Sequence, residues 1–430
     1  MNEKIEKLKA NPSFCSAPWV HVHSLPDGNI IPCCIWDYED YQSDRKKFGN
    51  INNSESMLAA LNNAGFKELR KKFLNGEHVP GCVRCYDREK YNVTSSMRHW
   101  FNSYTIDTEQ VEQNILQTKD DGTIDNVNIR YVDIRFGNIC NLKCRMCSHG
   151  LSSTWYEETG DLPDDLQWGG RSKTKFVHTD CYDKLDPYLK DVKEIYFAGG
   201  EPFLYPEHLK ILDRLVELGN TNCVLKYNTN LTTLKYKGRN FIDVWKNFPN
   251  VAVGASIDGM EDTVEYIRTN LVWKEFEENF NLVKTQAPHV HISPSITIGI
   301  LNIEKFADFE KYCLLNGWHG DRAFSLNYIM DPKYMNIQYL PIWYKQKMIK
   351  SLEDHIDWLK EKNITGFHYS KIVELISRLE DNTVSQFEIE EKIKRLKYAL
   401  DTYDITGNLN WKKSLPHIVE FFDRYEKESY

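Results

Sequence analysis

The segment "NICNLKCRMCSHG", residues 138–150, holds three cysteines within eight positions. Cys140, Cys144 and Cys147 are separated by three and then two residues. In a chain with 11 cysteines among 430 residues, this spacing is expected about 0.007 times by chance. Structural zinc takes four ligands, and a cubic iron–sulfur cluster normally takes four thiolates. Three cysteines therefore leave one metal position open, as a catalytic metal requires for binding a substrate or a cofactor.

The sequence around this segment alternates between strand and helix patterns. Helical patterns such as 205–220 and 303–317 separate most of the short apolar runs, which are typical of buried strands. These runs are residues 128–136, 193–199, 223–229, 251–257, 292–300 and 323–329. Six such alternations predict a parallel sheet with covering helices, in which functional residues follow the carboxyl ends of the strands. The cysteine trio directly follows the first strand.

Composition and charge exclude several classes of function. Apolar residues make up 41% and charged residues 27% of a chain with formal charge −8, which is typical of a globular protein. The basic runs 45–47 and 69–72 are isolated, and this disfavours nucleic-acid binding. The N-terminus lacks the apolar core of a signal peptide, and no run of 18 uncharged apolar residues indicates a membrane span. Eleven cysteines without an export signal then predict metal or catalytic chemistry in a reducing cytoplasm.

A second group of cysteines lies near the N-terminus, as Cys15, Cys33, Cys82 and Cys85. The turn signal "LPDG" at 25–28 predicts a hairpin that brings Cys15 and Cys33 together. Two cysteine pairs brought together would form a tetrathiolate site, which by spacing alone suits zinc as readily as iron. The remaining thiols are expected to be buried and inert. His21 and His23 are expected to be hydrogen-bonded within the protein or to face solvent, and not to bind a metal. Those remaining thiols are Cys34, Cys181, Cys223 and Cys313.

The spacing CxxxCxxC after the first strand resembles the signature of the radical S-adenosylmethionine (SAM) superfamily. The resemblance implies a partial (β/α)6 TIM-type barrel in which Cys140, Cys144 and Cys147 hold a [4Fe–4S] cluster. The fourth iron would chelate SAM, whose reductive cleavage gives methionine and a 5′-deoxyadenosyl radical that abstracts hydrogen from the substrate. An electron donor of the flavodoxin or ferredoxin type is implied as a partner.

Further residues match the family's SAM-binding positions in order along the chain. The segment "GGEP" after the second strand matches the one that binds the SAM amino group, and Met146 matches a bulky residue near the adenine. Ser256 and Asp258 are expected at the ribose hydroxyls, and Arg268 at the carboxylate as a bidentate fork. Asn230 is carried over weakly, because the family often has Thr-Asn-Gly where this chain has Leu after Asn230; the segment 300–302 is a weaker candidate near the adenine. The complete set is Met146, Gly199, Gly200, Glu201, Pro202, Asn230, Ser256, Asp258 and Arg268.

The N-terminal cysteines are similar to those of the twitch domain, a short relative of the SPASM domain that carries an auxiliary [4Fe–4S] cluster. The resemblance implies this cluster for Cys15, Cys33, Cys82 and Cys85, although the domain usually follows the barrel and here precedes it. The sequence thus predicts an N-terminal twitch domain over 1–95, a connector over 96–127, the barrel over 128–340 and a helical region over 341–430.

The predicted activity is an oxidative modification of a peptide or protein, since the SPASM-like domain occurs on enzymes with such substrates. An alternative is the oxidation or dehydrogenation of a small hydroxylated metabolite such as a sugar. A non-catalytic iron–sulfur or zinc scaffold would explain the cysteines, but not the ordered "GGEP", "SIDG" and arginine set. No acid or base for the substrate can be chosen from the sequence.

Overall fold

The computed structural model describes residues 3–37, 46–90, 96–148, 150–157, 162–163, 166, 181–319, 324–364 and 366–428. The chain divides into two compact units. The first comprises residues 1–139, 175–227 and 235–252, and the second comprises residues 140–174, 228–234 and 253–430.

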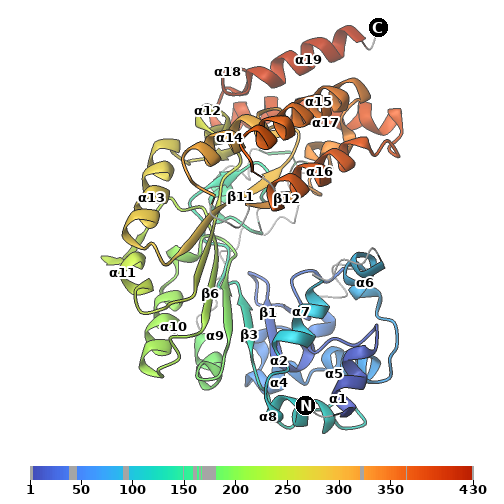
Figure 1. Cartoon of the computed structure of the whole chain (residues 1–430), viewed down its shortest axis with the longest axis vertical. Helices are drawn as coiled ribbons and strands as arrows, with labels where there is room; N and C mark the ends of the chain where they lie inside the picture. The colour runs from blue at the N-terminus through green and yellow to red at the C-terminus, as the bar shows by residue number, and fades with distance from the viewer. Residues whose placement is uncertain are drawn as a thin grey trace. The chain divides into compact units, whose positions relative to one another are not determined.

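The central sheet has eight strands in the order β12-β11-β9-β6-β5-β3-β1-β2 (Figure 1). Its strands are β1 (His21–Ser24), β2 (Ile30–Ile31), β3 (Tyr131–Ile134), β5 (Glu194–Phe197), β6 (Val224–Thr229), β9 (Val251–Ser256), β11 (His291–Ile298) and β12 (Ser325–Tyr328). The pairs β1–β3, β3–β5, β5–β6 and β11–β12 are parallel. Six of these strands fall within the six apolar runs of the sequence or start one residue before them. The predicted α/β class and its partial TIM-type barrel are confirmed.

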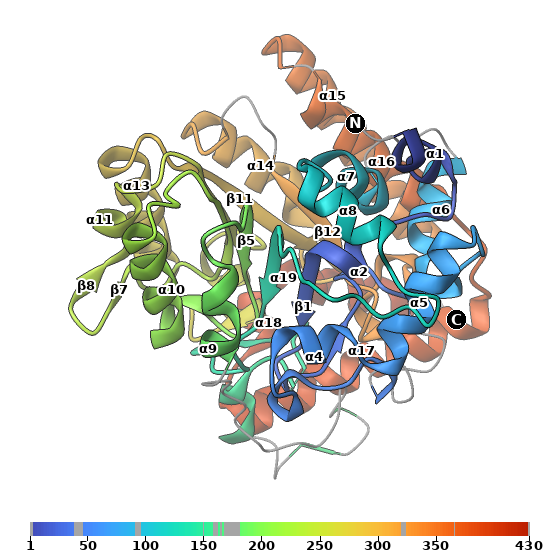
Figure 2. The same cartoon turned by 90° about the horizontal axis from the view of Figure 1, so that it is seen from below.

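Helices lie between consecutive strands along the chain, as the alternating pattern predicts. They are α9 (Cys181–Leu185), α10 (Pro206–Glu217), α11 (Phe241–Trp245), α12 (Glu261–Ile267), α13 (Trp273–Gln286) and α14 (Phe306–Leu315). The ring of His208 on α10 lies 4.4 Å from that of Phe197 on β5; both elements are labelled in Figure 2. His208 is fully buried, and burial lowers its pKa to about 3. The apolar side of β5 and β6 is therefore closed by aromatic packing.

The opposite face of the same strands is polar. His23, Asp133, Tyr196 and Lys226 stand side by side in register across β1, β3, β5 and β6. His23 Nδ1 lies 2.7 Å from Asp133 Oδ2, with both side chains buried. Burial works to raise the pKa of Asp133, but the charge and hydrogen bond of His23 outweigh it and lower that pKa. Both faces of a parallel sheet are ordinarily apolar, so a charged row marks this face for a role other than core packing.

The N-terminal part of the first unit consists of short elements around a hairpin. It contains α1 (Glu3–Ala10), α2 (Ala17–Val20), β1 and β2, η1 (Ile51–Asn53), α4 (Met57–Leu61), α5 (Ala64–Leu74), η2 (Pro80–Cys82) and α6 (Val83–Lys90). Strands β1 and β2 pair antiparallel, with His23 opposite Ile31, so the predicted hairpin is confirmed. The segment predicted as a polar connector holds two helices, α7 (Met97–Tyr104) and α8 (Glu109–Leu116).

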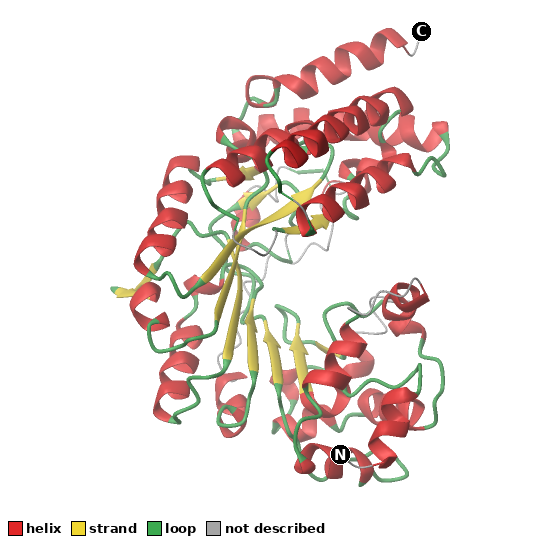
Figure 3. Ribbon diagram, in the orientation of Figure 1, coloured by secondary structure: helices red, strands yellow, loops and turns green. Residues whose placement is uncertain are grey.

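The C-terminal region is helical, as its amphipathic pattern predicts (Figure 3). It comprises α15 (Ile342–Glu361), α16 (Phe367–Glu380), α17 (Gln386–Gly407), α18 (Trp411–Ser414) and α19 (Pro416–Glu428). Helix α17 begins with a capping box between Ser385 and Glu388. Among the described residues, no helix is long and apolar enough to cross a membrane.

Candidate functional site

The loop that carries the cysteine trio is held by a pair of two-residue strands. Strand β4 (Lys143–Cys144) pairs antiparallel with β10 (Arg268–Thr269), which places Arg268 directly opposite Cys144. Arg268 is separated from this loop by more than a hundred residues in sequence. Backbone pairing therefore sets the position of the guanidinium relative to the cysteine.

Arg268 joins Asp258 to a cysteine sulfur. Its Nε lies 2.7 Å from Asp258 Oδ2, and its Nη1 donates to Cys144 Sγ at 3.8 Å, with Arg268 only 8% exposed. A hydrogen bond from Cys147 is the main cause that lowers the pKa of Cys144; burial opposes it, and the charge of Arg268 adds to it. The same hydrogen bond is the main cause that raises the pKa of Cys147. The structure thus lowers the pKa of Cys144 while it raises that of Cys147, and it brings these two cysteines of the loop together.

Cys140 is held by polar groups on both sides. Its amide donates to Ser153 Oγ at 3.4 Å, and its carbonyl accepts a hydrogen bond from the Thr154 hydroxyl. Asn230 Nδ2 donates to Asn141 Oδ1 at 2.8 Å and lies 3.9 Å from Cys140 Sγ. Asn230, which the family resemblance supports only weakly, is thus adjacent to the first cysteine.

The residue after Asn230 is Leu231, with a φ of 55°. This left-handed conformation is one that glycine adopts at little cost and leucine rarely adopts. Leu231 is fully buried. The chain therefore keeps the backbone shape of a Thr-Asn-Gly turn while it uses the leucine side chain to fill the core.

Asp258 is engaged by the protein at both carboxylate oxygens. Oδ2 pairs with Arg268, and Oδ1 accepts the amide hydrogen of Thr297 at 2.7 Å. The Asp258 carbonyl accepts from Asn302 Nδ2 at 3.0 Å. Ser256, at the end of β9, is half-buried. Asp258 in this structure orients Arg268, and its ribose contact stays a prediction.

Next to this network is a small cavity of about 10 Å³, which is room for roughly one water molecule. Its lining includes Met146, Leu301 and Asn302 together with Arg145 and Met335. Met146, Leu301 and Asn302, which the family resemblance places near the adenine, therefore line one cavity.

The "GGEP" segment follows β5 and has a backbone that requires glycine. Gly199 and Gly200 have φ values of 82° and 54°, and a Cβ on Gly199 would lie 2.5 Å from Cβ of Arg135. A Cβ on Gly200 would lie 2.4 Å from the carbonyl oxygen of Ile139, which also accepts the amide hydrogen of Glu201 at 2.8 Å. The turn is thereby fastened to the residue that precedes Cys140. Pro202 begins the short helix η6 (Pro202–Leu204), and the buried carboxylate of Glu201 caps it at the Phe203 amide.

The N-terminal cysteines also lie together. Cys15 precedes α2, Cys33 follows β2, Cys82 ends η2, and Cys85 is on α6. Burial is the main cause that raises the pKa of each thiol, to about 12 for Cys15, and the thiols are near enough to raise one another's pKa. Four protonated thiols in one place, two of them buried and two half-buried, form a site that becomes favourable when a metal displaces the protons.

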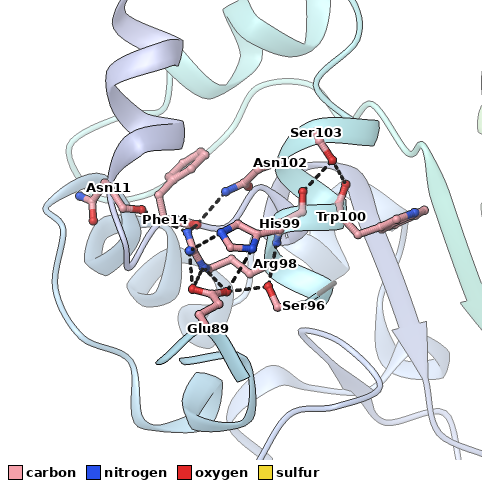
Figure 4. Close-up of polar contacts among 9 residues, drawn as sticks. All are labelled: Asn11, Phe14, Glu89, Ser96, Arg98, His99, Trp100, Asn102 and Ser103. Carbon is pink, nitrogen blue, oxygen red and sulfur yellow. Dashed lines mark hydrogen bonds and ion pairs between the residues drawn. The ribbon is translucent and has the colours of Figure 1, made fainter. Parts of the chain in front are cut away.

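An arginine clamp positions two of these cysteines (Figure 4). Arg98 on α7 is buried and forms a bidentate pair with Glu89 on α6, at 3.0 Å for Nε–Oε1 and 2.5 Å for Nη2–Oε2. Arg98 Nη1 also donates to the carbonyls of Asn11 and Phe14 at 3.2 and 3.1 Å. Because Glu89 follows Cys85 by one turn and Phe14 precedes Cys15, the clamp holds these two segments against each other.

Among the described residues, no group of three or more His, Cys, Asp or Glu side chains is close enough to hold a metal ion.

Some expectations about other thiols and histidines need correction. Cys34 was expected to be buried, but it is exposed, because it lies in the turn that follows β2. Cys181, Cys223 and Cys313 are buried as predicted. His21 and His23 are buried and face Tyr131 and Asp133. No sequence motif marks Arg98, Asn141 or Arg145, because an arginine or asparagine outside a motif carries no positional signal.

Family comparisons match two parts of the chain. The radical SAM superfamily matches residues 134–313, and an iron–sulfur cluster-binding domain of the SPASM family matches residues 15–86. The second match covers the four N-terminal cysteines. Among curated proteins, no match is found.

Solved structures with a similar arrangement are distant in sequence. The native enzyme anSMEcpe with bound SAM is 17% identical, with a TM-score of 0.40, over 55% of this chain and 62% of that one. SuiB from Streptococcus suis, bound to its precursor peptide SuiA, is 13% identical, with a TM-score of 0.39, over 76% of this chain and 71% of that one. The matched region thus spans about three fifths of the length of anSMEcpe.

Proposed function

Because the chain belongs to the radical SAM superfamily and carries an N-terminal SPASM-type iron–sulfur domain, we propose that it oxidatively modifies a peptide or protein. Its cofactors are SAM, a SAM-binding [4Fe–4S] cluster and an auxiliary iron–sulfur cluster. The modification would be a crosslink or the oxidation of a side chain. A flavodoxin- or ferredoxin-type donor and a cytoplasmic location complete the proposal.

Cys140, Cys144 and Cys147 would hold the first cluster, which together with SAM supplies a 5′-deoxyadenosyl radical. Arg268 supplies a positive charge beside Cys144 and is fixed by Asp258, so it is oriented before any ligand binds. Asn230 presents an amide beside Cys140. The "GGEP" turn leaves backbone groups at a strand end, where a SAM amine would bind.

The observation that carries the oxidative assignment is the second cysteine group. Cys15 and Cys85 are buried and Cys33 and Cys82 half-buried, and a cluster bound by all four thiols would have no open iron. A closed cluster can only accept or pass electrons. Loss of one hydrogen atom and one electron from the substrate, with a proton, is a net two-electron oxidation.

The oxidation of a small hydroxylated metabolite is the second candidate. It is favoured by the size of the N-terminal domain, whose matched region of residues 15–86 holds a single four-cysteine group. Both candidates use the same cofactors and differ only in the substrate.

The domain limits 1–95, 96–127, 128–340 and 341–430 are part of the proposal.

Anaerobic metal analysis and SAM cleavage test the cofactor chemistry. We expect about eight irons per chain, from two cubanes, and 5′-deoxyadenosine formation with a reductant. The Cys82→Ala/Cys85→Ala variant should retain about four irons and still cleave SAM, whereas Cys144→Ala/Cys147→Ala should retain the other four and cleave none. About four irons and one zinc in the wild type would contradict the auxiliary cluster.

The substrate class needs a separate experiment. Short peptides encoded next to the gene should be incubated with the reconstituted enzyme, SAM and reductant, and examined by mass spectrometry. A loss of two hydrogens from a peptide supports the first candidate. A neighbourhood of sugar-biosynthesis enzymes, with oxidation of a sugar and no change in any peptide, would replace it with the second.

A further inference from the structure

A buried arginine lies inside the cysteine loop, and it belongs neither to the cysteine ligands nor to the predicted SAM-binding residues. Arg145 lies between Cys144 and Met146 and is fully buried. Its amide donates to the Ile267 carbonyl at 2.8 Å, and its Nη2 donates to Thr269 Oγ1 at 2.7 Å. Nε and Nη1 have no hydrogen-bond partner among the described residues. A buried charge needs compensation, so the surroundings of this guanidinium are informative.

Three aromatic rings surround the guanidinium. Its central carbon lies 4.8 Å from the ring centre of Tyr403, 5.2 Å from Tyr266 and 5.3 Å from Trp155. These distances are within the range of cation–π attraction, which is strongest when the cation is desolvated. We call Arg145 and these three rings the arginine cage. The rings take the place of the missing hydrogen-bond partners.

The cage connects the cysteine loop to the C-terminal helices. Tyr403 is on α17, and its hydroxyl lies 3.0 Å from that of Tyr334. The next residue, Asp404, accepts the Tyr266 hydroxyl hydrogen at 3.1 Å and the Trp411 amide hydrogen at 2.7 Å. One wall of the cage therefore belongs to a helix that follows the barrel by about sixty residues in sequence.

We propose that Arg145 is a positioning residue through which the C-terminal helices hold the cysteine loop in its SAM-binding shape. Arg145 stands between two cysteines of the trio, and its amide and Nη2 bonds fix β4 to β10, where Arg268 faces Cys144. It also lines the small cavity that contains Met146 and Asn302. The helical region is thus part of the active-site structure, whatever the substrate is.

The test compares Arg145→Met with the wild type and with Arg70→Met. Arg70 is also fully buried, but it donates hydrogen bonds to carbonyls of the first unit, such as those of Gly122 at 2.8 Å and Pro18 at 2.9 Å. Each reconstituted protein is assayed for iron content and for the Kd of SAM, from the change in the spectrum of the reduced cluster. Hydrogen exchange of the 140–147 segment is followed in the protein without iron.

For Arg145→Met we expect about eight irons. We also expect a Kd for SAM raised about tenfold or more, the size of a typical coupling between two sites, and faster exchange of the loop, since the loop loses its contacts with the three rings. Arg145→Lys keeps the charge and should recover part of the SAM affinity. Arg70→Met should lower the thermal stability and leave the Kd for SAM unchanged.

The proposal is overturned if Arg145→Met folds and binds SAM as the wild type does. Should this variant fail to fold, Tyr403→Leu decides, because it removes a cage wall from α17 and leaves the loop sequence intact. Tyr403→Leu with weaker SAM binding and faster loop exchange supports the proposal. Tyr403→Leu with wild-type values for both refutes it.

Discussion

At the scale of single residues, the site depends on charges that compensate one another. Arg268 and Asp258 are both buried, and each is the other's main ionic partner. A buried pair contributes little net stability, but removal of one member leaves a buried charge without compensation. Hence their effects on stability should be strongly coupled.

Arg268→Met should lower the free energy of unfolding by about 3–5 kcal/mol, because Asp258 is left charged and buried. The double variant Asp258→Asn/Arg268→Met should recover part of this loss. Denaturant unfolding of the wild type, Asp258→Asn, Arg268→Met and the double variant under anaerobic conditions measures both effects. If the loss of stability in the double variant equals the sum of the losses in the two single variants, the residues do not interact.

At the scale of elements, turns and clamps hold the two cysteine groups. The "GGEP" turn is fixed by what surrounds its glycines, and α6 is fixed by Arg98. Neither feature is part of the cofactor chemistry. Both determine where cysteine-bearing segments lie, so their loss should affect cofactor binding as well as stability.

Gly199→Ala should cost more stability than Gly219→Ala. Both glycines have positive φ, 82° and 72°, but only at Gly199 would a Cβ clash, at 2.5 Å from Cβ of Arg135. Nothing lies within 4 Å of a Cβ at Gly219, so that change carries only the backbone cost of a side chain in the left-handed region, about 1–2 kcal/mol. Thermal unfolding should show the larger drop in Tm for Gly199→Ala. A similar drop in Tm for both variants would mean that the turn at Gly199 moves to accommodate the added methyl group.

Arg98→Met should reduce the iron content from about eight toward about four per chain, since the segments of Cys15 and Cys85 lose their clamp. SAM cleavage should persist, because the cysteine trio is untouched. Arg130→Met is the matched control: Arg130 pairs with Asp107 at 3.0 Å, away from the cysteines, and its loss should leave the iron count intact. Full iron occupancy in Arg98→Met would contradict the clamp.

At the scale of the whole molecule, buried histidines make stability depend on pH. Burial lowers the pKa of His208 to about 3, against an ordinary value of 6.5. Below pH 6.5 the unfolded chain binds a proton that the folded chain excludes until about pH 3. Stability from this residue is therefore complete above 6.5 and decreases as the pH falls through that window, by about 1.4 kcal/mol per unit.

His208→Phe should flatten the loss of stability between pH 6.5 and 5.0, because a phenylalanine at this position does not titrate. The neighbouring rings of Phe197 and Phe241, at 4.4 and 4.9 Å, accommodate an aromatic replacement. His289→Gln, at an exposed position, should leave the slope as in the wild type. Denaturant unfolding at a series of pH values measures the slopes. Equal slopes in all three proteins would refute the assignment to His208.

The sequence by itself determined the fold class, the six barrel strands, the hairpin and both cysteine groups. These follow from local signals: the period of apolar residues, turn residues and cysteine spacing act over a few positions and do not need the rest of the chain. Only the tertiary structure decided that Arg268 faces Cys144, that Arg98 clamps Glu89 to the segment before Cys15, and that α17 reaches Arg145. These contacts join residues far apart in sequence, and an arginine's partner is set by packing and burial, which no local pattern records.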